Sequence, residues 1–404
     1  MKLTIIGGGP GGYTAAFAAA KAGVEVTLVE RAHLGGTCLH TGCIPTKTLR
    51  SSADALDTVA RLREFGIAGD CAATPDMSAI VARKRKVTAT LQTGLEKTAA
   101  QLKVRVVRGD AEFVGAGLVR VASVDGSLEI AGDRVILATG SSPLELPSLP
   151  VDHRLVLSSD DALELQTVPE HLVVVGGGVI GCELAFIYRA FGAKVTVIEG
   201  QGRLLPLPSV DGEISRLLLR EMKKKGIAVE LARTVTATTP TGTGVSVEIG
   251  ASPFVEVANP PAPRTLEADA VCVTVGRVPH TDGLGLDAAG VKVDARGWIE
   301  ADDFLETSVP GVYAIGDVIG PRRIMLAHMA VAEAHTAVHN ILHPEDRKAQ
   351  RYDVVPSAIF TAPEIGDVGL SEAQAKQQGF AVPVPRARQG AGHGRTRRAV
   401  QARR

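Results

Sequence analysis

Short apolar runs that end in glycine recur along the chain and predict buried strands followed by tight turns. In "TIIGGGPGGYTAAFAAAKAGVEVTLVE" (4–30) an apolar run meets glycines, an alanine-rich stretch follows, and a second apolar run ends in an acid. The stretch "VVVGGGVIGCELAFIYRAFGAKVTVIE" (173–199) has the same order. Continuous apolar runs of this kind are typical of parallel strands that are buried on both faces. The pattern therefore predicts two strand–helix–strand units and an α/β fold.

Further stretches predict the elements between and after these two units. We expect helices at 213–226 and 323–342, because apolar residues recur there with a helical period. The predicted strands are 134–143, 227–232, 245–250, 254–258 and 268–281. Within 357–379 we expect a strand and then a short helix, with Ser371 and Gln374 as its capping box.

Two runs of positive charge occur in predicted helices. Arg83-Lys84-Arg85-Lys86 is interpreted as the start of a polar helix face. Lys223-Lys224-Lys225 falls in the last turn of a helix, where cations favour the helix dipole. Charge runs in helices are usually solvated faces, so we expect both runs to be exposed.

The two strand–helix–strand units repeat each other at a constant offset of 169 residues. The offset superposes Gly7, Gly9, Gly12 and Glu30 on Gly176, Gly178, Gly181 and Glu199. This is the dinucleotide fingerprint: the first glycine makes a tight turn, the second admits a pyrophosphate, and the third permits close helix–strand packing. A lone GxGxxG is weak, but two in full context predict two bound dinucleotides.

The acids that end the second strands indicate which dinucleotides these are. Glu30 and Glu199 are placed to accept hydrogen bonds from ribose hydroxyls, and a carboxylate there disfavours the 2′-phosphate of NADP. Arg203 lies four residues beyond Glu199, too far along the chain to be assigned to a phosphate. We therefore predict NAD at the second fingerprint.

Composition limits the remaining classes of function. The 404 residues carry 44 basic and 44 acidic side chains, so net charge gives no reason to expect a nucleic-acid partner. Five cysteines are too few, and odd in number, for a secreted disulfide scaffold. No apolar stretch approaches the roughly 18 residues of a membrane helix, and no signal peptide precedes the first strand. We expect a cytoplasmic protein with no membrane partner.

Two cysteines five positions apart, Cys38 and Cys43, are the strongest candidates for chemistry. Zinc would need four ligands, and no second cysteine pair is present, so no metal site is predicted. In a regular helix their Cα atoms would lie about 8–9 Å apart, beyond the roughly 7 Å that a disulfide spans. Either the pair is not bridged, or the backbone bends, which Gly42 would permit. Pro45 suits a first helical turn and would place Cys43 at a helix N-terminus, where a thiolate is stabilised.

The segment "GGTCLHTGCIPTKTL" (35–49) resembles the redox-active segment of the flavoprotein disulfide reductases, closest to the dihydrolipoamide dehydrogenases. The resemblance continues in order through "GGGVIGCE", "VGRVP", "GVYAIGDV", "LAHMA" and "FTAPEIGDVGLSE". It covers residues 1 to about 383. It implies FAD at the first fingerprint, NAD at the second, and electron flow from dihydrolipoamide through a Cys38–Cys43 disulfide and FAD to NAD+.

The resemblance also implies individual roles. Cys43 is the flavin-facing thiol and Cys38 the interchange thiol, while Lys47 approaches the flavin and pairs with Glu183. Cys38, Cys43, Lys47 and Glu183 are thus the predicted catalytic residues. Besides the two fingerprints, the predicted cofactor-binding residues are Lys47, Gly140, Gly276, Asp317, Ala327 and His328. Cys182 and Cys272 are interpreted as small core residues, and Cys71 as part of a loop.

The resemblance implies a domain plan as well. Two Rossmann-like domains are expected, an FAD domain at 1–151 and 270–345 and an NAD domain at 152–269, followed by an incomplete α+β dimerisation domain at 346–384. The family's C-terminal His–Glu pair, its acid–base group, has no match here, since the only histidine after residue 350 is His393. We therefore expect weakened dimerisation and reduced turnover.

The last 20 residues, 385–404, contain seven arginines and no acid. We interpret this tail as out-of-frame or truncated sequence, with a basic tail for nucleic acid or membrane as the alternative. Two other functions stay open beside a lipoyl-linked homodimeric enzyme. One is an NADH-oxidising diaphorase without lipoamide turnover, and the other is a non-catalytic product that binds polyanions through its tail.

Overall fold

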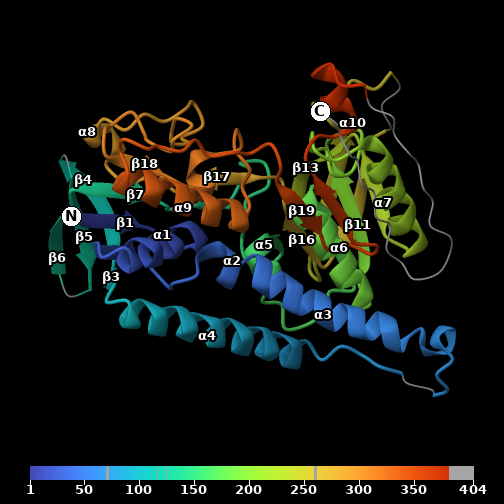
Figure 1. Cartoon of the computed structure of the whole chain (residues 1–404). Helices are drawn as coiled ribbons and strands as arrows, with labels where there is room; N and C mark the ends of the chain where they lie inside the picture. Colours follow the sequence, from blue (N-terminus) through green and yellow to red (C-terminus); the bar gives the residue numbers. More distant parts are fainter. Residues whose placement is uncertain (70–71, 116, 125, 259–261, 382–404) are drawn as a thin grey trace. The chain divides into compact units, whose positions relative to one another are not determined.

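The computed structural model describes residues 1–69, 72–115, 117–124, 126–258 and 262–381 (Figure 1). The chain forms two compact units, each built from separate segments. Unit 1 comprises residues 1–45, 85–142 and 277–352, and unit 2 comprises residues 46–84, 143–276 and those from 353 onward. The predicted tail at 385–404, with His393, lies outside the described residues, as does Cys71.

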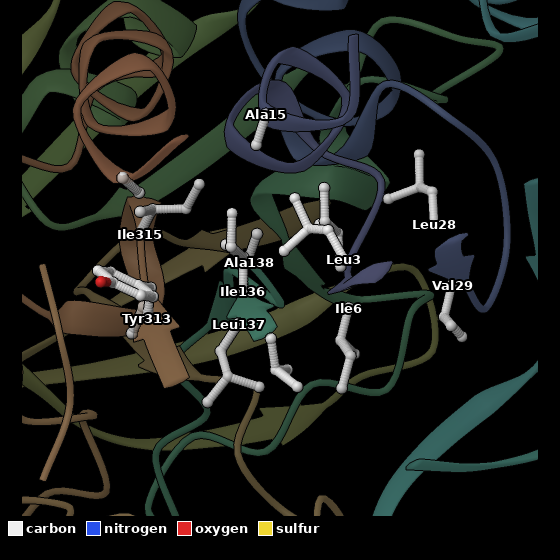
Figure 2. Packing of buried hydrophobic residues seen from close by; sticks show 14 of the residues in the cluster. Leu3, Ile6, Ala15, Leu28, Val29, Ile136, Leu137, Ala138, Tyr313 and Ile315 are labelled. Carbon is white, nitrogen blue, oxygen red and sulfur yellow. The ribbon is translucent and has the colours of Figure 1, made fainter. Parts of the chain in front are cut away.

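Unit 1 is built on a five-stranded parallel sheet in the order β18-β7-β1-β2-β3. Its strands are β1 (Lys2–Ile6), β2 (Glu25–Glu30), β3 (Arg105–Arg108), β7 (Arg134–Leu137) and β18 (Val312–Ala314). Helices α1 (Pro10–Lys21) and α9 (Ala327–Leu342) pack against each other beside this sheet. Figure 2 shows apolar side chains of β1, β2, β7 and β18 on both faces of this sheet, with Ala15 of α1 over one face and Ile6, Val29 and Leu137 pointing to the other.

Smaller elements complete unit 1. Three antiparallel strands, β4 (Asp110–Gly115), β5 (Leu118–Ser123) and β6 (Gly126–Ala131), form one sheet, and β8 (Ser141–Pro143) pairs with β17 (Arg277–Pro279). The short helices are α2 (Gly36–His40), α8 (Leu286–Ala289) and the 3₁₀ turn η2 (Gly316–Ile319). The long helix α4 (Met77–Gln101) begins in unit 2 and continues in unit 1.

Unit 2 repeats the plan with a parallel sheet in the order β12-β11-β10-β16-β9. Its strands are β9 (Val156–Ser158), β10 (His171–Val175), β11 (Lys194–Glu199), β12 (Ala228–Leu231) and β16 (Ala270–Val273). An antiparallel sheet of β13 (Arg233–Pro240), β14 (Val245–Ala251) and β15 (Arg264–Ala268) and the hairpin β19 (Pro356–Ile359) with β20 (Ile365–Val368) complete its strands. Its helices are α3 (Cys43–Val59, begun in unit 1), η1 (Leu62–Phe65), α5 (Ser159–Ala162), α6 (Val179–Ala190), α7 (Gly212–Lys224) and α10 (Glu372–Gln377).

Strand order fixes where a ligand can bind in each unit. In unit 1 the chain runs from β1 outward to β2 and β3, whereas β7 and β18 lie on the other side of β1. In unit 2, β10 is likewise flanked by β11 and β12 on one side and by β16 and β9 on the other. The strand order thus reverses beside β1 and beside β10. Open parallel sheets bind ligands outside the carboxyl ends of strands at such a reversal.

The α/β class with two Rossmann-like units is confirmed, and three local predictions are wrong. Residues 254–258 form no strand, and β14 pairs with β13 and β15. A short alternating pattern does not by itself supply the neighbouring strand that a sheet requires. Residues 270–273, predicted in the FAD domain, form β16, which lies between β10 and β9 in the unit 2 sheet. The predicted helix at 323–342 begins only at Ala327, because the backbone at Leu326 is extended.

The compact units also differ in bounds from the predicted domains. Unit 2 includes residues 46–84, which the sequence placed with the FAD domain, and the residues from 353 onward, which it placed in a separate dimerisation domain. The reason is packing: Leu49, Ala53 and Met77, together with Ile359 and Ile365, join the apolar core around α6. None of the described helices is long and apolar enough to cross a membrane.

The charge run at 83–86 is not a uniformly solvated face, so this prediction is wrong. Lys84 is 2% exposed, and its Nζ donates to the carbonyl oxygen of Leu163, 2.8 Å away, and pairs with Glu164. Helix α4 begins at Met77, and Lys84 falls on the same face as buried Met77 and Val81. The predicted capping box is confirmed: Ser371 and Gln374 form it at the start of α10.

We predict that Lys84→Ala lowers the free energy of unfolding of unit 2 by about 2–4 kcal/mol, because it removes a packed four-carbon stem and leaves a buried carbonyl without its donor. Lys86→Ala, at an exposed position on the same helix, is the matched control and should change it by less than about 0.5 kcal/mol. Urea unfolding measures both. If both variants changed the free energy of unfolding by the same small amount, Lys84 would be a solvated residue and its assignment to the buried face would be wrong.

Candidate active site

The first glycine-rich turn connects β1 to α1. At two of its positions the surrounding backbone leaves room for glycine alone. Gly7 has φ +104°, and a Cβ there would lie 2.3 Å from the carbonyl oxygen of Ala138. A Cβ on Gly12 would lie 1.7 Å from the carbonyl oxygen of Gly7. No side chain fits at such distances, so helix α1 can approach β1 this closely only because both residues are glycine.

The second turn, between β10 and α6, repeats this geometry. Gly176 has φ +108°, and a Cβ there would lie 2.5 Å from the carbonyl oxygen of Thr274. A Cβ on Gly181 would lie 1.9 Å from the carbonyl oxygen of Gly176. The sequence repeat is therefore a repeat of structure, with the same glycines required for the same reason.

The middle glycine of each fingerprint is different, because nothing in the protein requires it. Gly9 and Gly178 have φ −73° and −75°, which any residue adopts. A Cβ on Gly9 would meet no atom closer than 3.8 Å, and one on Gly178 would meet none within 4 Å. Each begins a helix, as N-cap of α1 and α6, without a side-chain cap. The space left by these two glycines is open to a ligand.

The acid that ends the second strand ties that strand to the glycine turn in both units. Glu30 accepts hydrogen bonds from the backbone N–H of Gly8 at 2.6 Å and of Ala32 at 2.7 Å. Glu199 accepts from Gly177 at 2.5 Å and Gln201 at 2.6 Å. A carboxylate has about four acceptor sites. Each acid therefore keeps acceptor capacity for ribose hydroxyls after binding the turn.

The cysteine segment of unit 1 starts directly on the first glycine turn. The backbone N–H of Gly35 donates to the carbonyl oxygen of Gly8 at 2.8 Å, and a Cβ on Gly36 would lie 2.6 Å from the Cα of Gly9. Both glycines are left-handed, with φ +119° and +57°. Helix α2, which carries Cys38, begins at Gly36. Cys38 therefore lies two residues beyond a backbone contact with the dinucleotide turn.

The backbone between the two cysteines is bent, as a bridge would require. Helix α2 ends at His40, Thr41 leaves helical geometry with φ −136°, and α3 begins at Cys43. A Cβ on Gly42 would lie 2.9 Å from the carbonyl oxygen of Thr37, so this bend excludes a larger residue there. Cys43 is thus the first residue of a 17-residue helix, as predicted, and both cysteines are half-buried.

Tyr13 on α1 lies beside the cysteine pair. Burial raises the pKa of its phenol, and the nearby Cys38 and Cys43 raise that pKa further. Its ring also contacts Phe17, with centroids 5.8 Å apart. No pattern in the sequence indicated this tyrosine, because its proximity to the cysteines arises only when the cysteine segment folds back onto α1.

In unit 2, Lys47 pairs with Glu183, the contact that the family resemblance implied. The Lys47 Nζ lies 2.9 and 3.1 Å from the two carboxylate oxygens. Glu183 is almost fully buried on α6 and also accepts from the backbone N–H of Phe360 at 2.9 Å. Lys47 stands 4.4 Å from the centre of the Phe360 ring. The ammonium group is thereby held in one place by a carboxylate and an aromatic face.

Asp317 lies after β18, at the same edge of the unit 1 sheet as the first glycine turn. Its carboxylate accepts a hydrogen bond from Ser141 Oγ at 2.7 Å. Arg277 binds the same serine, donating to Oγ at 2.7 Å and to the carbonyl oxygen at 2.6 Å. The sequence predicted Asp317 but missed Ser141 and Arg277, although Arg277 belongs to the "VGRVP" motif.

The remaining predicted residues have simple placements. Ala327 is the first residue of α9, and His328 beside it is exposed. Gly140 has φ +75°, and Gly276 has φ +152°. Arg203 donates to the carbonyl oxygens of its own loop, Leu207 and Val210, each at 2.8 Å. Its guanidinium therefore has a structural role in the loop after β11.

The other described cysteines belong to the core, as predicted. Cys182 and Cys272 are fully buried. Burial raises the pKa of the Cys182 thiol far above its usual range and that of Cys272 to about 12. Thiolates, not thiols, are the nucleophiles. Neither residue has the environment of a reactive cysteine, which leaves Cys38 and Cys43 as the described candidates.

Comparison with known proteins agrees with this geometry. The model of the pyridine nucleotide-disulphide oxidoreductases matches residues 1–334. The chain belongs to the pyridine nucleotide-disulphide oxidoreductase family. It is 40% identical to a dihydrolipoyl dehydrogenase of Geobacillus stearothermophilus over 383 residues, covering 94% of this chain and 78% of the relative. A dihydrolipoyl dehydrogenase of Bacillus subtilis is 37% identical over 93% of this chain and 79% of its own.

Two solved structures show the same fold. LpdA from Mycobacterium tuberculosis superposes with a TM-score of 0.85 at 28% identity, covering 95% of this chain and 81% of LpdA. The HOCl-induced flavoprotein disulfide reductase RclA from Escherichia coli gives a TM-score of 0.80 at 29% identity, over 95% of this chain and 80% of RclA. Membership of the pyridine nucleotide-disulphide oxidoreductase family therefore establishes both the fold of this chain and its class of enzyme, an oxidoreductase.

Oxidoreductases of this family use FAD and NAD(H), which confirms the cofactor prediction. The open space at Gly9 and at Gly178, beside helix N-termini with no side-chain cap, fits a dinucleotide pyrophosphate at each turn. The acceptor capacity left on Glu30 and Glu199 fits the adjoining ribose. The residues present therefore suit the two cofactors that the family uses.

We predict that two neighbouring glycine substitutions affect different properties, one the stability of the protein and the other NADH binding. Gly181→Ala should lower the free energy of unfolding by about 1–3 kcal/mol, since its Cβ overlaps Gly176. Gly178→Ala should leave stability unchanged or raise it by up to about 1 kcal/mol, yet weaken NADH binding at least about tenfold by obstructing the pyrophosphate. Urea unfolding without nucleotide and NADH fluorescence titration measure the two quantities. Unchanged NADH binding in Gly178→Ala would remove this turn from the nucleotide site.

We predict that native alkylation distinguishes the cysteines. After mild reduction at pH 8, iodoacetamide should label Cys38 and Cys43 within minutes. The peptides of Cys182 and Cys272 should stay unlabelled until the protein is unfolded, because burial raises the pKa of both thiols well above that pH and both side chains are inaccessible to the reagent. Peptide mass spectrometry reads each site separately. Rapid native labelling of Cys272 would contradict its assignment to the core.

Proposed function

We propose that this chain is a dihydrolipoyl dehydrogenase, which oxidises a dihydrolipoyl group to the cyclic disulfide and reduces NAD+. The observation that carries the proposal is the contact of Gly35 and Gly36 with the first glycine turn, which starts the cysteine helix beside a dinucleotide site. The relatives from Geobacillus stearothermophilus and Bacillus subtilis are dihydrolipoyl dehydrogenases. A redox-active cysteine pair next to a flavin site is what this reaction requires.

The proposed residues divide by role. The catalytic group consists of Cys38, Cys43, Lys47 and Glu183. The proposed FAD-binding residues are Gly7, Gly9, Gly12, Glu30, Lys47, Gly140, Asp317, Ala327 and His328. The proposed NAD-binding residues are Gly176, Gly178, Gly181, Glu199 and Gly276. No metal is part of the proposal.

The protein's own sulfurs perform the exchange. A substrate thiolate attacks the Cys38 sulfur of the Cys38–Cys43 disulfide, the S–S bond breaks, and Cys43 leaves as a thiolate at the N-terminus of α3. The second substrate thiol attacks the substrate sulfur of the mixed disulfide, which closes the lipoyl ring and expels Cys38 as a thiolate, and the Cys38 sulfur takes up the proton that the attacking thiol loses. Two electrons have then passed from the substrate to the protein dithiol. When bound, FAD supplies the two-electron relay from that dithiol to NAD+.

Placement of Cys43 at the first residue of α3 favours its role as the leaving and stored thiolate. The positive end of the helix dipole stabilises an anion at that position. Cys38 follows the left-handed glycines on a short helix of five residues. The two sulfurs therefore have different electrostatic surroundings, as distinct interchange and storage roles require.

The proposal extends to partners and place of action. The natural substrate would be the lipoyl group of a lipoyl-carrying protein, and the enzyme would act in the cytoplasm as a weakly associated homodimer. The names of the relatives support the lipoyl substrate. Cysteines that cycle between thiol and disulfide suit a reducing compartment.

The test is turnover with dihydrolipoamide and NAD+ by purified, FAD-loaded protein. We expect Cys38→Ser and Cys43→Ser each to lower kcat by more than about 10³-fold, since either change removes one sulfur of the relay. Both variants should keep bound FAD and should still reduce a dye with NADH. In the reduced wild-type protein a long-wavelength absorbance band should mark a thiolate beside the flavin, and Cys43→Ser should abolish it.

Cys272→Ala is the matched control, because it removes a buried cysteine that the relay does not use. It should keep turnover within about twofold. Dye reduction by the wild type without dihydrolipoamide turnover would reject the proposal in favour of a diaphorase. Absence of FAD, with retention on a polyanion column, would reject it in favour of a non-catalytic binding protein.

A further inference from the structure

Glu333 is a buried carboxylate that the proposed reaction does not use. It lies on α9 and is 1% exposed. Its Oε2 accepts a hydrogen bond from the backbone N–H of Gly316 at 2.6 Å, and its Oε1 accepts from the hydroxyl of Tyr352 at 2.7 Å. A charged group in such a position is stable only when its oxygens are hydrogen-bonded. The two bonds link segments 36 residues apart in sequence.

One of these segments belongs to the proposed FAD site. Gly316 directly precedes Asp317 and has the left-handed φ of +73°. The peptide N–H that Glu333 holds is therefore one residue from the carboxylate that Ser141 positions from the other side. The backbone and the side chain of this loop are fixed by separate groups, and Glu333 fixes the backbone.

The other segment, residues 348–352, has no helix or strand, and side chains of α9 hold it. Asn340 bonds both the N–H and the carbonyl oxygen of Lys348, at 2.7 and 3.0 Å. Thr336 donates to Gln350 at 2.7 Å, and Glu333 binds Tyr352. The three helix positions are spaced by three and four residues and so share one face. Besides this helix face, the backbone N–H of Gln350 donates to the carbonyl oxygen of Asp303 at 2.8 Å, and the Arg323 guanidinium lies 4.9 Å from the centre of the Tyr352 ring. The contacts from α9 are thus one part of what holds the segment.

We infer that Glu333 is a positioning residue that couples FAD binding at the Gly316–Asp317 loop to the order of residues 348–352. A ligand that favours the held form of the loop also favours the Glu333 rotamer that Tyr352 requires. By reciprocity, an ordered segment raises the affinity of the loop for the ligand by the same factor. The inference rests on the proposed FAD site.

The order of residues 348–352 can be measured by proteolysis. Lys348 is exposed and is followed by alanine, so trypsin can cut there when the segment opens. In the full-length protein we expect saturating FAD to slow cleavage after Lys348 at least about tenfold. Tyr352→Phe removes only the hydroxyl that Glu333 binds. It should cut the FAD-dependent protection to about twofold and raise the FAD dissociation constant about five- to tenfold, measured by flavin fluorescence.

Two further variants distinguish coupling from general damage. In Glu333→Gln the amide oxygen can still accept from the N–H of Gly316, and the amide nitrogen can donate to the hydroxyl of Tyr352. This variant should therefore keep most of the FAD-dependent protection against trypsin, whereas Glu333→Ala should lose it. Tyr188→Phe is the matched control, because this buried tyrosine donates to the carbonyl oxygen of Ala162 in unit 2. It should change neither quantity.

The outcomes separate the two proposals. If wild-type protein binds FAD but Tyr352→Phe keeps both wild-type affinity and wild-type FAD-dependent protection, the coupling is wrong and the proposed function stands. Equal losses in Tyr352→Phe and Tyr188→Phe would also overturn it, since the effect would then be loss of stability. A wild-type protein that binds no FAD overturns the proposed function and this inference together.

Discussion

The close approach of a helix to the strand that precedes it is the constraint on which both units depend. At Gly12 and Gly181 a single methyl group would overlap a backbone carbonyl at less than 2 Å. Because the helix cannot be moved outward without opening the apolar core, glycine is the only residue that satisfies the packing. The same approach aims the N-terminus of the helix at the edge of the sheet where the strands end, and thereby creates an anion site.

The chain beyond each glycine turn is organised around the same contact. The acid at the end of the second strand binds the turn from one side, and the segment after that strand binds it from the other. Glu30 and Gly35 do this in unit 1. Because these bonds join residues more than 20 positions apart, the turn, the strand end and the following loop form one rigid edge. A dinucleotide would meet a surface that is already in place.

The sequence predicted the features that a local pattern encodes. The glycine positions, Cys43 at the start of a helix and the capping box at Ser371 each follow from residues within one turn or one unit. The Lys47–Glu183 contact came only from the family resemblance, since the two residues are 136 positions apart. Features that depend on long-range packing were missed. Lys84 was judged by its charged neighbours, although its spacing from Met77 and Val81 placed it on the buried face. The clamp at Glu333 joins a helix to an irregular segment, which has no periodic signal at all.

The two units differ in the chain that follows their second strands. In unit 2 the backbone N–H that binds the turn at Gly177 belongs to Leu205, a buried residue with φ +48°. In unit 1 the equivalent N–H belongs to Gly35, and a second left-handed glycine then directs the chain into the cysteine helix. The sheets and the nucleotide turns of the two units are alike, but the connection that follows the second strand is not. From β2 to β3 it holds α2, α3, η1 and α4, whereas from β11 to β12 it holds α7. The cysteine pair therefore lies in a connection that the second half of this duplicated architecture builds differently.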